Sequence, residues 1–338
     1  LQDCGGGERK PAPMPPARSA TILDRLLASP EPSIRYKATV HVLGRDPASP
    51  EVLALQEEIS RSARVKAMLD GLGPPGRFTR HAYSKWTGAH WVLATLADVG
   101  YPPGDDSLRP LRDHVFDWLF GAAHQKSIRT VRGRVRRCAS QEANAVWYLL
   151  TLGLADERVD ALARRLVEWQ WPDGGWNCDK RPEVVISSFM ESLIPLRALA
   201  LHARVTGSGA SQRAAERAAG IFLKRRLFRR AGDGEVMAED FTRLHYPCYW
   251  HYDILFALKV MAEAGYIDDP GCAEALDLIE SKRLPDGGFP AEKRYWHHRE
   301  KAGSGLETVD WGPTGKTRSN DWVTVDALRV LKASGRVA

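Results

Sequence analysis

An internal repeat constrains the fold of this 338-residue chain more than any other feature of its sequence. The segment at 78–101, FTRHAYSKWTGAHWVLATLADVGY, matches the segment at 241–266, FTRLHYPCYWHYDILFALKVMAEAGY, apart from two extra residues in the second. Both place apolar residues at helical spacing, and similar segments recur about every fifty residues along the chain. A period of this length is typical of stacked helical hairpins that share one continuous core.

Further copies of the apolar segment end in a small residue, as helices that stop at glycine or alanine do. They lie at 33–44, 137–153, 184–200 and 319–335. Charged, amphipathic segments suited to an outer layer alternate with them. These lie at 17–28, 49–70, 106–121, 156–170, 209–229 and 270–283. Because strand patterns are almost absent, the sequence predicts an all-α, single-domain α/α toroid at 17–338, with about six inner and six outer helices.

The composition is that of a globular chain, with 43% hydrophobic residues, 27% charged residues and a net charge of +6. No apolar run is long enough for a transmembrane segment, so none is predicted. The five cysteines are odd in number and lack a paired spacing, which favours reduced thiols and a cytoplasmic location. The Gly- and Pro-rich stretch at 1–16 is expected to be a disordered tail.

Two of the charged helices are predicted to end in a sharp Pro-Asp-Gly-Gly turn, in the segments LVEWQWPDGGWN and IESKRLPDGGFP. In the first segment, Gln170, Gly174 and Trp176 match the Gln-Trp motif of the prenyltransferase and squalene-cyclase repeat superfamily, which the chain resembles over most of its length from about residue 30. The second copy has Arg283 and Phe289 where the motif has Gln and Trp. The resemblance implies that the motif ties neighbouring repeats together, and that ligands bind in a central cavity near the inner-helix N-termini.

The resemblance also implies a function. Squalene-type cyclases start their reaction with an Asp-x-Asp-Asp motif, which this chain lacks. We therefore expect a terpenoid cyclase- or prenyltransferase-like protein that binds or transforms an isoprenoid-like or other largely apolar or amphiphilic small molecule, with a prenyl diphosphate among the candidates. Whether it is an enzyme is left open by the sequence.

Aromatic residues beside ionisable ones mark the candidate site, because they suit a carbocation or an apolar ligand with a polar head. Helical spacing predicts that Tyr246, Trp250 and Asp253 share one helix face. The candidate catalytic residues are Asp253, His251, Glu191 and Asp326. The candidate substrate-binding residues are Lys85, Trp86, His90, Glu142, His245, Tyr246, Tyr249, Trp250, Asp321 and Trp322. Since burying an unpaired carboxylate is costly, Glu191 and Asp326 need partners or a polar pocket. The alternative interpretation is an aromatic core without a ligand.

Zinc-dependent prenyl transfer is an alternative function that the resemblance implies. Protein prenyltransferases of this fold hold zinc with Asp, Cys and His side chains near inner-helix starts. This chain offers those residue types at His245, Cys248 and His251, and at Cys178 and Asp179 after the Gln-Trp turn. Because the Asp-x-Cys element of that family is missing, no metal site is predicted and zinc is only an alternative cofactor.

Two further functions are left open by the sequence. One is a non-catalytic repeat scaffold that binds protein or nucleic acid on a basic rim containing Arg134, Arg136 and Arg137, although no specific nucleic acid is predicted. The other is a glycan-processing toroid, which would need paired carboxylates such as Glu142 and Glu191 in one cleft. The long loop at 290–316 interrupts the repeat, and loops of this length often cover binding sites.

Overall fold

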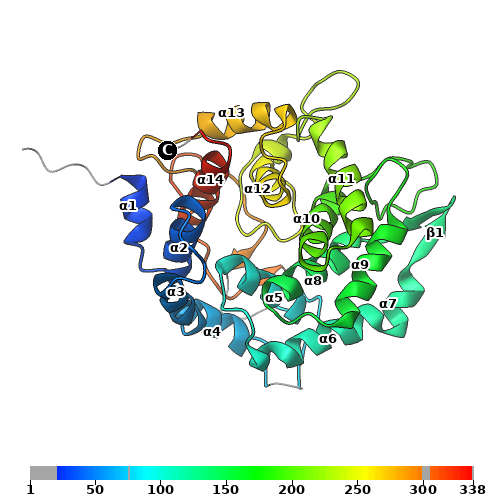
Figure 1. The fold of residues 1–338 in the computed structure, drawn as a ribbon, viewed down its shortest axis with the longest axis horizontal. Helices are drawn as coiled ribbons and strands as arrows, with labels where there is room; N and C mark the ends of the chain where they lie inside the picture. The colour runs from blue at the N-terminus through cyan, green and yellow to red at the C-terminus, as the bar shows by residue number, and fades with distance from the viewer. Residues whose placement is uncertain (1–20, 75–76, 299–304, 337–338) are drawn as a thin grey trace, which may run out of the picture.

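The computed structural model describes residues 21–74, 77–298 and 305–336, and within them the chain is mostly helical (Figure 1). This confirms the all-α class. The tail predicted at 1–16 lies outside the described residues. No helix in the described part is both long and apolar enough to cross a lipid bilayer.

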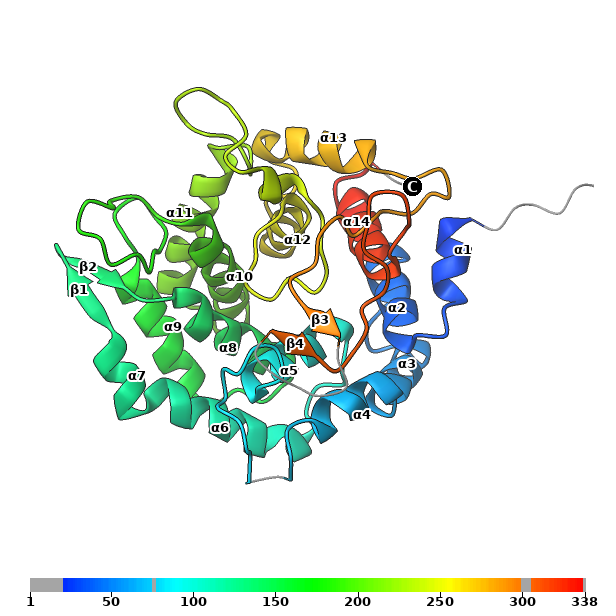
Figure 2. The same cartoon turned by 180° about the vertical axis from the view of Figure 1, so that it is seen from behind.

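Six buried helices contact one another in a closed order. Each coincides with one copy of the apolar segment. They are α2 (Pro32–Lys37), α5 (Ala89–Val99), α8 (Ala139–Thr151), α10 (Phe189–Thr206), α12 (Ile254–Ala264) and α14 (Asp321–Ala333). Each packs against the next in this sequence, and α14 returns to pack against α2. Figures 1 and 2 show these helices around a common centre.

Half-exposed helices lie outside the six, as the charged segments predict. Five inner helices are each followed in the chain by an outer helix that packs against them, forming helical hairpins. The outer helices are α1 (Ile22–Leu27), α3 (Pro50–Ser60), α4 (Ala63–Asp70), α6 (Arg109–Phe120), α7 (Ala122–Ser127), α9 (Glu157–Trp169), α11 (Gly209–Leu223) and α13 (Ala273–Ser281). A π-helical segment, η1 (Ala38–Val42), continues α2, and the short 3₁₀ helices are η2 (Asp106–Leu108), η3 (Glu239–Thr242) and η4 (Pro270–Cys272).

The two best-matched repeat segments are only half helical, which corrects the sequence-based expectation. Residues 78–88 and 243–253 form turns that lead into α5 and α12. Asp253 is the N-cap of α12, because its carboxylate accepts a hydrogen bond of 2.7 Å from the Phe256 N–H. Tyr246, Trp250 and Asp253 therefore do not share a helix face. Both helices end as predicted, at Gly100 and Gly265 in the left-handed conformation.

The Gln-Trp turn after α9 is a structural tie between outer helices, as the resemblance implies. The Gln170 side-chain amide donates to the carbonyls of Gly174 and Ala214 at 2.7 and 2.8 Å, which links its own turn to α11. The buried Trp176 indole donates to the Leu166 carbonyl at 2.9 Å. Gly174 has φ +102, and a Cβ there would lie 2.6 Å from the Arg217 carbonyl oxygen. This position therefore requires glycine.

Two small sheets interrupt the helices where the sequence predicted none. β1 (Arg129–Val131) and β2 (Arg134–Arg136) are antiparallel, and Arg132 and Gly133 at their turn both have positive φ. This is the conformation of a tight hairpin turn, usually encoded by Asn-Gly or Asp-Gly and here by Arg-Gly. β3 (His297–His298) and β4 (Leu306–Glu307) pair in parallel within the long loop, and Figure 2 shows these two strands near the centre of the inner helices.

Candidate functional site

Two lysines and two aspartates from four inner helices form a buried ring of ion pairs, here called the central charge ring. Lys37 on α2 lies 3.0 Å from both Asp98 on α5 and Asp326 on α14. Lys259 on α12 lies 2.6 Å from Asp98 and 2.9 Å from Asp326. The Tyr246 hydroxyl donates to Asp98 at 2.9 Å. Asp326 thus has the partners that its burial was predicted to require.

The central charge ring keeps its carboxylates ionised. Burial favours their neutral form, but the charges of Lys259 and Lys37 outweigh it and hold the pKa of Asp98 well below its ordinary value. The same balance lowers the pKa of Asp326, although the neighbouring Asp98 charge opposes it. Both acids are therefore ionised at neutral pH, and neither is suited to donate a proton to a substrate.

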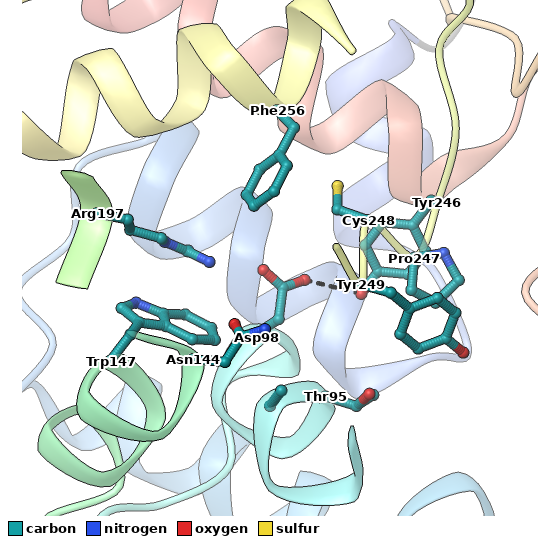
Figure 3. Close-up of a pocket in the computed structure, with 11 residues that line it drawn as sticks. Thr95, Asp98, Asn144, Trp147, Arg197, Tyr246, Pro247, Cys248, Tyr249 and Phe256 are labelled. Atoms are coloured by element: carbon teal, nitrogen blue, oxygen red, sulfur yellow. Dashed lines mark hydrogen bonds between the residues drawn. The ribbon is translucent and has the colours of Figure 1, made fainter. Parts of the chain in front are cut away.

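Two cavities lie beside the central charge ring, separated by Asp98, Trp147 and Arg197, which line both. The first, of about 40 Å³, is here called the aromatic cavity, and its remaining lining includes Phe256 and Tyr249 (Figure 3). Its full lining is Ala94, Thr95, Asp98, Asn144, Trp147, Arg197, Tyr246, Pro247, Cys248, Tyr249 and Phe256. Arg197 stacks on the Trp147 ring, with its guanidinium 3.6 Å from the ring centroid.

The second cavity, of about 210 Å³, is here called the arginine cavity. Arg197, Arg204 and Arg329 line it together with His41 and Glu263. These residues lie in the middle or C-terminal parts of α10, α12 and α14 and in η1, and not near the inner-helix N-termini where the resemblance placed the ligand. Glu263 accepts from Arg197 at 2.5 and 2.8 Å and lies 3.0 Å from Arg329. Burial opposes ionisation of Glu263, but the charges of Arg197 and Arg329 lower its pKa to about 2. Glu263 and Asp98 together supply two negative charges against the three positive charges of Arg197, Arg204 and Arg329, which leaves the lining with an excess of one positive charge.

The predicted catalytic residues Asp253 and His251 do not meet in one reactive pair. Asp253 is fully buried, accepts from the backbone N–H of His245 at 2.9 Å and lies 2.5 Å from its Nδ1. His251 is stacked between the rings of Trp250 and Tyr295, with centroid distances of 4.0 and 3.4 Å. Burial lowers the pKa of His251 to about 2, with the charge of His245 acting in the same direction. Asp253 therefore holds His245, in the turn segment before α12, against the start of that helix.

The predicted substrate-binding residues Lys85, Trp86, Tyr249 and Trp250 pack against one another. Trp86 stacks on Tyr249 with a centroid distance of 3.9 Å, and Lys85 lies 5.0 Å from the Trp250 ring. The Tyr249 hydroxyl donates to the buried Glu307 on β4. Burial raises the pKa of the Glu307 carboxyl. The long loop is therefore part of the packed interior here, through Glu307.

The long loop also contributes two buried aromatic side chains, Trp296 just before β3 and Trp311 after β4. Trp296 donates to the Tyr246 carbonyl at 3.0 Å, and Trp311 is in edge contact with Tyr246 and Trp322. The predicted residues Tyr246 and Trp322 stack on each other with centroids 5.0 Å apart. By contrast, Asp321 lies at the outer start of α14, where Arg25 approaches to 3.7 Å with both side chains substantially exposed. Asp321 is not part of this interior group.

The remaining predicted residues His90 and Glu142 lie in a separate buried cluster. His90 lies 3.2 Å from the Tyr148 hydroxyl, and burial lowers its pKa to about 3. Glu142 lies 2.6 Å from His124 Nε2, with both side chains fully buried. Glu191 has different partners, because its carboxylate accepts from the Ser140 N–H at 3.2 Å. Glu142 and Glu191 therefore serve different contacts, which weakens the glycan-hydrolase alternative.

The metal-ligating residue types are grouped differently from the sequence-based expectation. Within the described ranges, one group of three such side chains has all its ligand atoms within 4.8 Å of one another, namely Cys138, Cys178 and Glu191. His245, Cys248 and His251 form no such group among those residues, and neither does Asp179, whose carboxylate pairs with Arg181. Only Cys178 of the sequence-based zinc alternative is therefore retained.

The arginines of the expected basic rim are largely internal. Arg136 is buried, stacks on Trp171 at 4.3 Å and donates to the Asp179 carbonyl at 3.0 Å. Arg137 donates to Gln141 at 2.6 Å and contacts the His124 ring. Because Arg136 and Arg137 make these internal contacts, they offer little to a nucleic acid or protein partner.

Sequence reasoning missed Lys37, Asp98 and Lys259 of the central charge ring. A signal was present, because each is a charged residue within a largely apolar helical segment, as Glu191 and Asp326 are. It also missed Arg197, another charge inside an apolar segment. Which charges pair depends on which inner helices are neighbours, and the sequence alone does not provide this.

No protein-family model matches the chain, and no curated protein sequence is similar enough to count as a relative. A functional interpretation therefore depends on the geometry described above.

Proposed function

We propose that this chain is an α/α toroid of the prenyltransferase and squalene-cyclase type that binds a short amphiphilic molecule at its centre, with a short prenyl diphosphate as the best candidate. The observation that carries this proposal is the pair of cavities on either side of Trp147 and Arg197, one aromatic and one rich in arginine. Aromatic faces suit hydrocarbon or developing positive charge, and guanidinium groups suit phosphate oxygens.

The toroid assignment is supported by the sequence in which the six inner helices pack against one another. The order closes on itself when α14 packs against α2, and five inner helices each contact the outer helix that follows them. The contacts made by Gln170 between neighbouring outer elements agree with the role of the Gln-Trp motif.

Cavity size limits the ligand. Pockets for drug-sized molecules are about 300–1,000 Å³, whereas the aromatic and arginine cavities are about 40 and 210 Å³. A squalene-sized or polyprenyl chain therefore does not fit without large rearrangement. The shortest prenyl groups fit best, with the Trp147 and Arg197 side chains shifting so that the two cavities join.

The protonation of the acids favours binding or group transfer over acid-initiated cyclisation. Asp98 and Asp326 face the centre in ionised form, each held by two lysines. An ionised carboxylate can stabilise positive charge on a neighbouring group but cannot start a cyclisation by protonating a double bond. This agrees with the missing Asp-x-Asp-Asp motif.

Isothermal titration calorimetry with dimethylallyl diphosphate, the corresponding alcohol and inorganic diphosphate tests the proposal. Arg204→Ala removes an exposed cation of the arginine cavity and should weaken binding of both diphosphates about tenfold, without affecting the alcohol. Ala94→Leu narrows the aromatic cavity and should weaken only the two prenyl ligands. Arg213→Ala, on the exposed face of α11, is the matched control.

Either of two results would overturn the proposal. One is that none of the three compounds binds. The other is that binding occurs but is unchanged in both Arg204→Ala and Ala94→Leu, which would place the ligand elsewhere on the protein.

A further inference from the structure

Three elements that are separate in sequence bring two thiols and one carboxylate together at the edge of the inner layer. Cys138 is the N-cap residue of α8, Cys178 follows the Gln-Trp turn, and Glu191 lies in the first turn of α10. Their ligand atoms all lie within 4.8 Å of one another. This cluster is separate from the residues that line the aromatic and arginine cavities.

The surrounding contacts hold the carboxylate in place. The Glu191 carboxylate accepts from the Ser140 N–H at 3.2 Å through Oε2, and its Oε1 lies 3.7 Å from the Cys178 sulfur. One oxygen is thus anchored to the start of α8, while the other faces the thiol. Because α8 and α10 pack against each other, this spacing is fixed by the core of the protein.

The loop that carries Cys178 is also held on both sides. The Asn177 side chain accepts from the Asp179 N–H at 3.0 Å and donates to the Ile186 carbonyl at 3.0 Å. The buried Arg136 donates to the Asp179 carbonyl at 3.0 Å. With the loop held in this way, the Cys178 sulfur lies within 4.8 Å of the ligand atoms of Cys138 and Glu191. Outer contacts of this kind orient ligands and strengthen metal binding.

We propose that Cys138, Cys178 and Glu191 bind a zinc ion. Thiolate sulfur together with carboxylate oxygen is a donor set that zinc accepts, whereas calcium and magnesium prefer oxygen alone. Three protein ligands leave the fourth tetrahedral position open for water or a substrate atom. Both cysteines are only half-buried, so an ion and a fourth ligand have a route from solvent.

The charge near the cluster suits such an ion. Two thiolates and a carboxylate would carry three negative charges, one more than zinc neutralises. Arg137, adjacent to Cys138, supplies a positive charge beside the cluster while its side chain is held by Gln141 and His124. Arg136 adds a second cation near the cluster, where it donates to the Asp179 carbonyl in the Cys178 loop.

The test uses the full chain, reduced and stripped of metal, and does not depend on the proposed prenyl ligand. Titration with Co²⁺ should produce the near-ultraviolet absorption of thiolate–cobalt bonds, and Zn²⁺ should displace it at about one ion per chain. Cys138→Ser and Cys178→Ser should abolish this absorption. Glu191→Gln should weaken zinc binding at least tenfold while keeping it. Cys272→Ser, which changes a buried cysteine elsewhere, is the matched control.

Two results would overturn the proposal. The first is that the reduced, folded wild-type protein binds no zinc and shows no thiolate–cobalt absorption, a result that needs no variant to fold. The second is that the protein as purified, after denaturation, has two fewer reactive thiols than its five cysteines and that Cys138→Ser restores one, which would assign the pair to a disulfide instead.

Discussion

Removing one lysine from the central charge ring should destabilise the protein strongly. Lys259 contacts two carboxylates, at 2.6 and 2.9 Å, and its side chain is 2% exposed. At an effective dielectric constant of about 20, each contact corresponds to a gross attraction of about 6 kcal/mol, most of which is offset by the cost of removing the charges from water. Lys259→Met leaves one lysine for two buried carboxylates, so we expect a loss of about 3–5 kcal/mol.

A second substitution tests whether the loss arises from charge imbalance. Lys259→Met with Asp326→Asn leaves Lys37 and Asp98 as a balanced pair. We therefore expect the double variant to lose about 1–3 kcal/mol less than the sum of the two single losses. Urea unfolding, followed by circular dichroism and tryptophan fluorescence, measures all four proteins. Losses below about 1 kcal/mol for Lys259→Met, or strictly additive losses, would refute the reasoning.

The central charge ring should also set a pH window of stability. The pKa of Asp326 lies below its ordinary 3.8, so its contribution is present at neutral pH and is lost as acid protonates the folded protein. The pKa of Lys259 lies above its ordinary 10.5, because the charges of Asp326 and Asp98 outweigh its burial. Its contribution is therefore lost only in strong base. Between about pH 4 and 10, the loss of unfolding free energy caused by Lys259→Met should be nearly constant.

Three further predictions concern other parts of the fold. Gln170→Ala removes two hydrogen bonds to carbonyls and should cost about 1–3 kcal/mol in urea unfolding, whereas Arg283→Ala in the degenerate copy should cost less than half as much. Gly174→Ala should cost about 1–2 kcal/mol more than Gly207→Ala, because both have positive φ but only Gly174 lies against backbone, and equal costs would contradict this. Below about pH 6.5, His90 takes up a proton in the unfolded chain but stays neutral in the folded protein, because burial lowers its pKa to about 3. The free energy of unfolding should therefore fall by about 1.4 kcal/mol for each pH unit because of this residue, and His90→Asn should show a correspondingly flatter slope of unfolding free energy against pH.

The sequence predicted the helical elements well because their signals are local. Apolar spacing located the buried helices, and glycines such as Gly100 marked where they end. The outer segment at 156–170 agrees with α9 (Glu157–Trp169) to within one residue at each end. The predictions were wrong where a segment has the composition of a helix but its first half forms turns. Asp253 caps α12, so the residues before it turn away from the helix axis.

The candidate site was less predictable, because it depends on which helices become neighbours. Asp326 was correctly expected to need partners, but those partners, Lys37 and Lys259, come from two distant repeats. Similarly, Cys178 was noted as a metal-ligating residue type, whereas its grouping with Cys138 and Glu191 depends on the packing of α8 against α10. Pairing of this kind is tertiary information that a single repeat does not contain.

The closing contact between α14 and α2 has a consequence for how the protein is made. Lys37 and Lys259 leave the ribosome before Asp326 has been synthesised, so neither can reach its full set of carboxylates in a nascent chain. Early helical hairpins can form as they emerge, but their lysines stay hydrated until α14 has been synthesised. Synthesis of α14 therefore completes the interior of the first repeat as well as its own.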